Sequence, residues 1–187
     1  MKSLFELAGQ LEQFFQDQNW RYCFIGGLAN QRWGRPRTTV DVDITILTGF
    51  GSEESFIDKL LSRYQPRIPD PRSFALQHRV LLIQSPDNIG IDISLGGIPF
   101  EESMIARASQ FEFLPGISLL TCAAEDLIVL KAFADRDQDW IDVEGVILRQ
   151  KGLLDWDYIF SQLTPLAQLK ESPTLIPNLK RLRQENA

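Results

Sequence analysis

The sequence predicts an α+β fold, with a mixed β-sheet flanked by helices in residues 1–120 and a helical part in residues 121–187. Up to about residue 120, short runs rich in Val, Ile and Thr alternate with segments of helical periodicity. From residue 123 onwards, apolar residues recur only at helical spacing. We therefore expect an α/β domain with a helical C-terminal region packed on it.

The first part opens with an amphipathic helix, because apolar residues recur at helical spacing between Leu4 and Phe15. Ser52 followed by two glutamates is typical of a helix start. Three prolines in residues 65–72 predict a loop, and Asp87-Asn88 predicts a hairpin turn. Strands are expected at residues 21–25, 39–47, 79–83, 89–95, 111–113 and 117–120, and further helical segments at residues 28–33, 52–64 and 100–108. In the second part, helices are expected around residues 127–133, 140–148 and 155–166, with a short helix or tail at residues 180–183.

Composition narrows the function classes. The 187 residues are 44% hydrophobic and 24% charged, as in an ordinary globular protein. A net charge of −6 without long basic runs argues against a protein dedicated to duplex DNA. The sequence has no run of about 18 apolar residues, so we expect no membrane span. We therefore expect a cytoplasmic protein. Cys23 and Cys122 have apolar neighbours, which favours buried reduced thiols.

Three aspartates lie among strand-forming residues. Asp41 and Asp43 are two residues apart, so their side chains share one face of the strand. Aspartate is a poor strand former, and the pair repels itself unless a cation lies between the carboxylates. If the strand at residues 89–95 lies beside theirs, Asp92 faces the pair. Oxygen ligands favour Mg²⁺, and three carboxylates can hold two such ions about 4 Å apart.

The glycines before this strand complete the pattern. Gly26-Gly27 ends an apolar strand and precedes a short helical segment. Without Cβ atoms the backbone can approach an anion closely, and the helix N-terminus offers unpaired N–H groups. Arg35 and Arg37 follow in a basic loop, where a guanidinium can bind phosphate bidentately. These features together indicate a site for the triphosphate of an NTP.

This arrangement resembles the nucleotidyltransferase superfamily of DNA polymerase beta and kanamycin nucleotidyltransferase. The resemblance covers residues 24–43, Asp92 and a helical segment from residue 123 to 146. The spelling Arg37-x-Thr39-x-Asp41-x-Asp43 is especially similar to bacterial nucleotidyltransferase toxins of abortive-infection systems. So is the segment beginning Ala124-Glu125-Asp126-Leu127, which leads to Lys131, Arg136, Asp139 and Asp142.

The resemblance implies transfer of a nucleoside monophosphate from an NTP to a hydroxyl of an RNA end, a protein or a small molecule, with Mg²⁺, and in the toxin branch an antitoxin partner. By analogy Asp41, Asp43 and Asp92 are catalytic and bind the metal. Gly26, Gly27, Arg37, Thr39 and Lys131 are the corresponding nucleotide-binding residues. Gly27 departs from the pattern, because many members have a serine at this position. The glycine keeps the backbone contact but lacks the hydroxyl donor of that serine.

Each feature also has a simpler interpretation. The aspartates can lie on solvated surfaces, the glycines can form a plain tight turn, and Arg37 can be an ordinary loop charge. Lys131 and its charged neighbours can be the solvated side of two helices. At the level of function, the alternatives are an inactive nucleotide-binding or regulatory module of the same fold and a metal-dependent phosphodiesterase.

Overall fold

A computed structural model describes residues 3–186 of the chain. The chain divides into two compact units. The first contains Met1–Leu28 and Thr38–Cys122, and the second contains Ala29–Arg37 and Ala123–Ala187. Helix α2 (Gly26–Trp33) therefore begins in the first unit, and the loop that follows it belongs to the second. The division expected from the sequence, an α/β domain at residues 1–120 with a helical region at residues 121–187 packed on it, remains a prediction.

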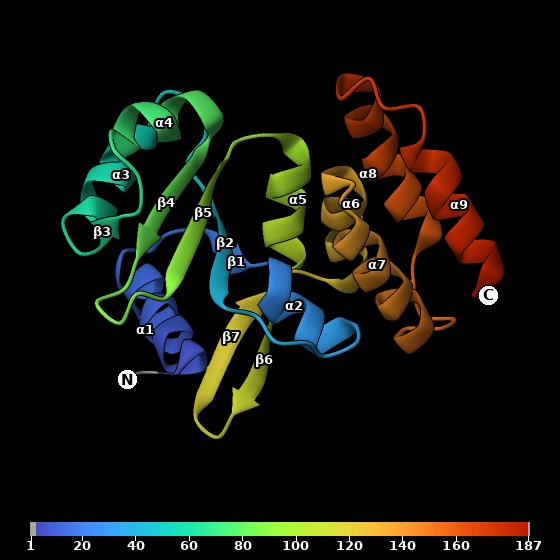
Figure 1. The fold of residues 1–187 in the computed structure, drawn as a ribbon, viewed down its shortest axis with the longest axis horizontal. Helices are drawn as coiled ribbons and strands as arrows, with labels where there is room; N and C mark the ends of the chain where they lie inside the picture. The colour runs from blue at the N-terminus through green and yellow to red at the C-terminus, as the bar shows by residue number, and fades with distance from the viewer. Residues whose placement is uncertain (1–2, 187) are drawn as a thin grey trace. The chain divides into compact units, whose positions relative to one another are not determined.

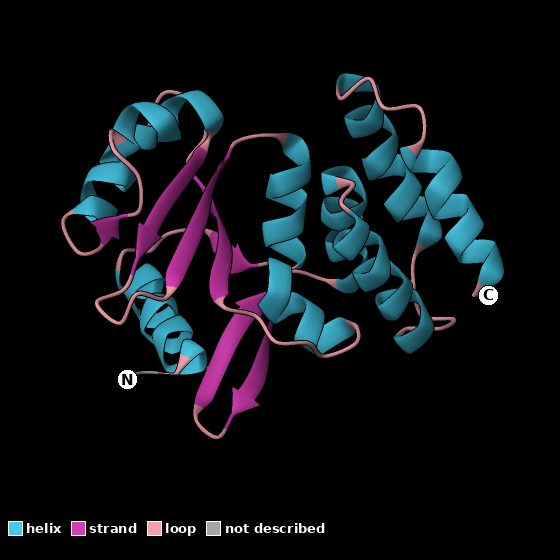
Figure 2. Ribbon diagram, in the orientation of Figure 1, coloured by secondary structure: helices cyan, strands magenta, loops and turns pink. Residues whose placement is uncertain are grey.

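The described part of the first unit contains a seven-stranded mixed sheet of order β3-β4-β5-β2-β1-β7-β6 (Figures 1 and 2). Strand β2 pairs in parallel with β5, whereas β4 and β5 form the predicted antiparallel hairpin. The mixed sheet with flanking helices confirms the predicted α+β fold class. The strands are β1 (Tyr22–Phe24), β2 (Asp41–Leu47), β3 (Gln65–Pro66), β4 (Val80–Gln84), β5 (Gly90–Gly96), β6 (Ser109–Leu114) and β7 (Ile117–Thr121).

Helices cover the two faces of this sheet differently. The main core joins α1 (Leu4–Asp17), α3 (Glu53–Leu61) and α4 (Pro71–His78) to one face, where Val42, Ile44 and Ile46 of β2 are fully buried. Because side chains alternate along a strand, Asp41 and Asp43 point to the other face. There α5 (Pro99–Arg107) packs on β2 and β1. Asp41 and Asp43, at the start of β2, remain half-exposed.

The predicted loop at residues 65–72 is wrong in part. Gln65–Pro66 forms the short strand β3, and Pro71 begins helix α4. Pro71 occupies the first helical turn, where a missing N–H costs nothing, and the Asp70 side chain accepts a hydrogen bond from the Ser73 amide. Arg79, predicted as a strand residue, instead ends α4 in a left-handed conformation.

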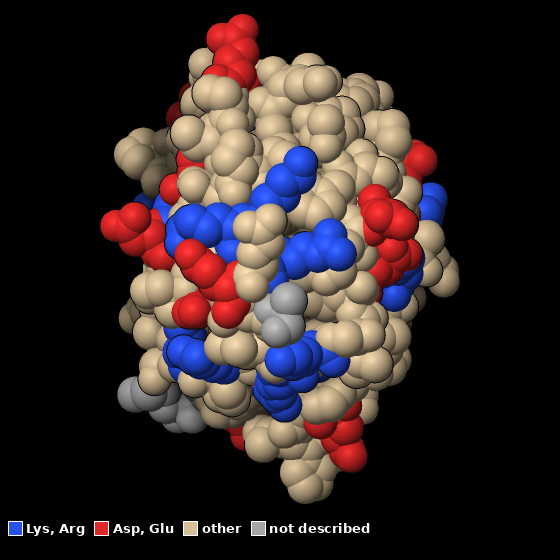
Figure 3. Space-filling view, turned by 90° about the vertical axis from the view of Figure 1, so that its right-hand side faces the viewer, with Lys and Arg blue, Asp and Glu red and all other residues tan. Residues whose placement is uncertain are grey.

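The second unit is helical, as predicted, with α6 (Ala124–Ala134), α7 (Asp137–Arg149), α8 (Trp156–Leu169) and α9 (Leu175–Glu185). The face seen in Figure 3 carries basic and acidic side chains side by side. Exposed Lys180, Arg181 and Arg183 belong to α9. Surfaces that bind duplex DNA are usually dominated by basic residues, whereas this face carries both charges.

Cys23 and Cys122 are both buried, as expected. None of the helices within residues 3–186 has the length and apolar character needed to cross a membrane.

Candidate active site

Asp41, Asp43 and Asp92 converge on one face of the sheet. Strands β2 and β5 run in parallel with Asp43 directly opposite Asp92 and Asp41 opposite Gly90. Each of the three side chains offers a carboxylate oxygen, and these atoms all lie within 4.8 Å of one another. The sequence-based inference that Asp92 faces the aspartate pair is therefore correct as geometry.

A charged cluster of this kind fits a divalent cation. Carboxylate oxygens are hard ligands, and oxygens this close to one another can bind the same divalent cation. Burial raises the pKa of Asp92 above its usual value; Arg67 opposes that rise and the neighbouring Asp41 carboxylate adds to it. The site thus brings together negative charges that a cation would relieve.

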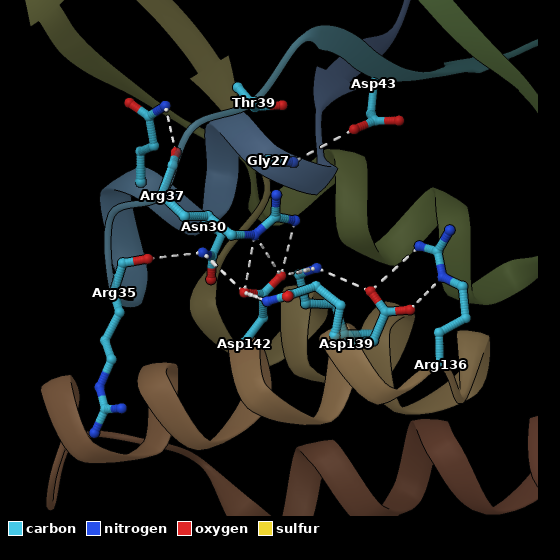
Figure 4. Close-up of polar contacts among 12 residues, drawn as sticks. Gly27, Asn30, Arg35, Arg37, Thr39, Asp43, Arg136, Asp139 and Asp142 are labelled. Atoms are coloured by element: carbon cyan, nitrogen blue, oxygen red, sulfur yellow. Dashed lines mark hydrogen bonds and ion pairs between the residues drawn. The ribbon is translucent and has the colours of Figure 1, made fainter.

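Gly26 lets the backbone pass directly beside Asp43. Its φ is +56°, a left-handed conformation that favours glycine, and an added Cβ would lie 2.0 Å from Oδ2 of Asp43. The Gly27 amide, at the start of α2, donates a 3.4 Å hydrogen bond to the same oxygen (Figure 4). The glycine turn therefore lies against the Asp43 carboxylate, and its role as a phosphate cradle remains a prediction.

Thr39 accounts for the absence of a side chain at position 27. A Cβ on Gly27 would lie only 2.3 Å from Oγ1 and 2.7 Å from Cβ of Thr39. The Thr39 hydroxyl also donates a 3.2 Å hydrogen bond to Oδ1 of Asp41. A hydroxyl thus does lie beside the glycine turn, but it comes from Thr39, two residues before strand β2; residues 39 and 40 were predicted as strand and lie outside it.

Arg67 is a site residue that the sequence analysis missed. Its Nη2 is hydrogen-bonded and ion-paired to Oδ1 of Asp92. Its backbone amide donates to the carbonyl of Leu82, which stands opposite Asp92 in the β4–β5 pair. The segment was predicted as a loop, so no sequence signal placed Arg67 near the aspartates.

Arg37 and Lys131, both predicted to bind nucleotide, lie together in the second unit (Figure 4). Nζ of Lys131 lies 3.0 Å from Oδ1 of Asp139 and 2.6 Å from Oδ2 of Asp142. Nη2 of Arg37 lies 3.0 Å from the same oxygen of Asp142, and Nε of Arg136 lies 2.5 Å from Oδ2 of Asp139. We call these five side chains the Lys131 network.

The lysine and both aspartates of the Lys131 network are buried, whereas the Arg37 and Arg136 side chains are 37% and 77% exposed. Lys131, Asp139 and Asp142 are 5%, 2% and 3% exposed, so the interpretation of these charges as the solvated side of two helices is wrong. Burial alone would raise the pKa of Asp139 and Asp142, but hydrogen bonds from Arg136 and Lys131 to the first and from Arg37 and Lys131 to the second hold each below its usual value. The nucleotide contacts of Arg37 and Lys131 remain predictions.

The network also holds the loop that follows α2. Asn30, fully buried, donates a 3.0 Å hydrogen bond to the Arg35 carbonyl and a longer one to Asp142. Nη1 of Arg149 donates 2.8 Å to the Gly34 carbonyl. An added Cβ on Gly145 of α7 would lie 3.1 Å from the Arg35 amide, so the loop packs closely on that helix. This loop leads directly into the strand that carries Asp41 and Asp43.

The chain is similar in fold to several solved structures. The chain resembles an antigenic nucleotidyltransferase-like protein from Paracoccidioides brasiliensis, with a TM-score of 0.52, 17% identity, and coverage of 95% of this chain and 92% of that one. It resembles the lincosamide antibiotic adenylyltransferase LnuA, with a TM-score of 0.54, 13% identity, and coverage of 77% and 96%. It also resembles the antibiotic-resistance factor ANT(2'')-Ia, with a TM-score of 0.52, 15% identity, and coverage of 90% and 92%. At these identities the likeness shows the fold alone. No protein of curated function matches the chain.

The family comparison covers most of the sequence. The sequence model described as "Nucleotidyl transferase AbiEii toxin, Type IV TA system" matches residues 7–150. That range includes the aspartate cluster, the glycine turn and the Lys131 network. The chain is therefore a nucleotidyltransferase that belongs to the AbiEii toxin family.

Proposed function

We propose that the chain is a Mg²⁺-dependent enzyme that transfers a nucleoside monophosphate from an NTP to a hydroxyl of an acceptor. One observation carries this proposal: Asp41, Asp43 and Asp92 bring carboxylate oxygens to within 4.8 Å of one another beside a glycine turn at a helix N-terminus. Cation ligands and an anion cradle on one face of a sheet are the parts that phosphoryl transfer requires.

The carboxylates of Asp41, Asp43 and Asp92 hold the metal in this proposal. Bound Mg²⁺ would stabilise the negative charge that develops on the attacking and leaving oxygens. When the nucleotide binds, the Gly27 amide and the Thr39 hydroxyl would exchange their hydrogen bonds to Asp43 and Asp41 for bonds to the triphosphate, beside the Gly26 amide at the start of α2. Arg37 and Lys131 are separate proposed nucleotide contacts, and both are paired with Asp142 in the structure.

The proposed transfer step needs one general base, which takes the proton of the acceptor hydroxyl. The acceptor oxygen forms a bond to the α-phosphorus, the bond from that phosphorus to the bridging oxygen breaks, and pyrophosphate leaves. The proton of the acceptor hydroxyl passes to the carboxylate of Asp92. Asp92 is assigned this role because it stands opposite Asp43 on the neighbouring strand, at the edge of the proposed metal site.

The family description adds a biological role. Its toxin designation supports a proposal that transfer to a cellular acceptor is harmful and is opposed by an antitoxin. An RNA end, a protein and a small molecule are the acceptor classes to be tested.

The test is transfer of label from each of four α-³²P-labelled NTPs, beginning with ATP, to RNA, protein and small-molecule acceptors with Mg²⁺. We expect wild type to label one acceptor class and Asp43→Asn to lose at least about 100-fold of that activity, since removing one metal ligand charge costs several kcal/mol of transition-state stabilisation. Asp58→Asn is the matched control, because Asp58 is an exposed aspartate paired with Arg72 in the same unit.

The alternatives give different results. Release of free nucleoside monophosphate without labelled acceptor would identify a phosphodiesterase. Nucleotide binding without any product would identify an inactive binding or regulatory module. A folded wild-type protein that binds neither Mn²⁺ nor NTP would contradict the proposed function outright.

A further inference from the structure

Arg67 is held at its backbone, and the end of its side chain reaches Asp92. Its amide is bonded to the Leu82 carbonyl, so the residue lies alongside β4 and its side chain crosses towards β5. There Nη2 pairs with Asp92, while Nη1 lies 3.0 Å from where a Cβ on Gly90 would stand. Gly90 is opposite Asp41 in the strand pair, so the guanidinium lies over the region of the aspartate cluster.

The bare backbone of Gly90 makes room for this arrangement. An added Cβ there would crowd Nη1 of Arg67 at 3.0 Å and would lie in ordinary contact with Cβ of Asp41 at 3.4 Å. The pair itself is partly open to solvent, with Arg67 and Asp92 side chains 29% and 31% exposed. An ion pair of this exposure adds little stability, so structural support is a weak reason for placing a guanidinium at a metal ligand.

We propose that Arg67 is the resident cation of the metal site: it neutralises Asp92 in the metal-free protein, competes with the metal for that carboxylate, and binds a substrate phosphate once the metal displaces it. This inference rests on the proposed function. A guanidinium and a divalent cation repel each other at one carboxylate, and the repulsion is weakened when the guanidinium binds an anion instead. The planar fork of arginine suits bidentate phosphate binding, and its long side chain can move while the backbone remains fixed.

The test measures Mn²⁺ binding directly, by calorimetry and by the electron paramagnetic resonance signal of free Mn²⁺. Without any anion, Arg67→Gln is expected to bind Mn²⁺ about three- to fivefold more tightly than wild type, because the competing cation is gone. Arg67→Lys keeps a charge and is expected to stay near wild type. Arg72→Gln, which removes an arginine from an exposed pair in the neighbouring helix, is the matched control and is expected to change nothing.

The phosphate half is tested at saturating Mn²⁺ with two probes. Pyrophosphate represents the tail of the nucleotide, and a 5′-phosphorylated dinucleotide represents a nucleic-acid acceptor. Arg67→Gln is expected to bind one of them about tenfold more weakly, which corresponds to the loss of a charge-assisted hydrogen bond. Arg67→Lys is expected to recover part of this binding, because it keeps the charge without the fork.

Asp92→Asn distinguishes failure of the proposed metal site from failure of the proposed role of Arg67. If it binds Mn²⁺ as well as wild type does, the proposed metal site fails, and the role of Arg67 fails with it. If Asp92→Asn loses Mn²⁺ binding but Arg67→Gln binds Mn²⁺ no more tightly than wild type, the metal site stands and the competition is refuted. Unchanged binding of both phosphate probes by Arg67→Gln would likewise overturn the proposal.

Discussion

The Lys131 network offers the most direct test of how the helical unit is held together. Replacing Lys131 with methionine removes the buried ammonium and keeps a side chain of similar length. Removing one partner from a buried ion pair commonly costs about 3–5 kcal/mol. Here Asp139 and Asp142 each retain an arginine, Arg136 and Arg37 respectively. We therefore expect Lys131→Met to lower the free energy of unfolding by about 2–3 kcal/mol.

Urea unfolding followed by tryptophan fluorescence is the suitable assay. Trp33, Trp140 and Trp156 lie in the second unit, so three of the four tryptophans report on it. The measurement is made without nucleotide or metal, so that any loss of ligand binding does not contribute. An equal slope of the free energy against urea concentration would show that the midpoint shift reflects stability.

Arg181→Ala is the control for removing a basic side chain of this unit. Arg181 pairs with Glu185 on the exposed surface of α9, and its loss is expected to cost no more than about 0.5 kcal/mol. If Lys131→Met changes stability no more than Arg181→Ala does, the buried pairing is not a stabilising element. In that case a loss of activity in the same variant would favour a direct nucleotide contact.

Three further predictions follow from the geometry. The fold lowers the pKa values of Asp139 and Asp142, so these two carboxylates stabilise the folded protein above the ordinary aspartate pKa. This contribution to the free energy of unfolding is expected to be lost as the pH falls below about 4, which unfolding curves measured between pH 7 and pH 3 check. Gly26→Ala, at φ +56°, is expected to lower stability by about 1–2 kcal/mol from backbone strain alone and to weaken Mn²⁺ binding measured by calorimetry. Gly27→Ser is expected to cost about 1–3 kcal/mol in thermal unfolding, and Thr39→Gly in the same chain should recover part of that loss, because it removes both the hydroxyl and the Cβ that the new side chain meets.

The strand pair that carries the aspartates was within reach of sequence analysis. Alternation along residues 39–47 assigns Val42 and Ile44 to one face and the aspartates to the other. The few polar residues after β4 predict its hairpin with β5. What sequence could not provide was the order of strands, and the conclusion that Asp92 faces Asp43 depended on β5 lying beside β2.

The prediction was wrong where prolines were interpreted only as breakers. Pro66 lies in an edge strand, where a missing N–H is tolerated, and Pro71 opens a helix capped by Asp70. Treating the whole segment as a loop hid the pairing of β3 with β4. It therefore also hid Arg67, whose place beside Asp92 follows from that pairing.

The sequence analysis did not predict the burial of Lys131 for a different reason. Helix α6 buries residues around most of its circumference, so a lysine within it has little access to solvent. Its charge is tolerated only because Asp139 and Asp142 come from the next helix, and Asp142 is in turn paired with Arg37, 105 residues earlier in the chain. No local pattern contains that information, since a charge on a helix is ordinarily a sign of a solvated face.

Gly27 and Thr39 show how a departure from a family pattern can be resolved by packing. Taken alone, the glycine suggests a weakened phosphate site, because the serine hydroxyl is missing. In the fold, Thr39 fills the space that a side chain at position 27 would need and brings its own hydroxyl to the same turn. The two positions therefore act as one: a hydroxyl-bearing side chain at either place excludes one at the other. On this reasoning packing against Thr39 explains the glycine, and the missing serine gives no support to the interpretation of the chain as an inactive module.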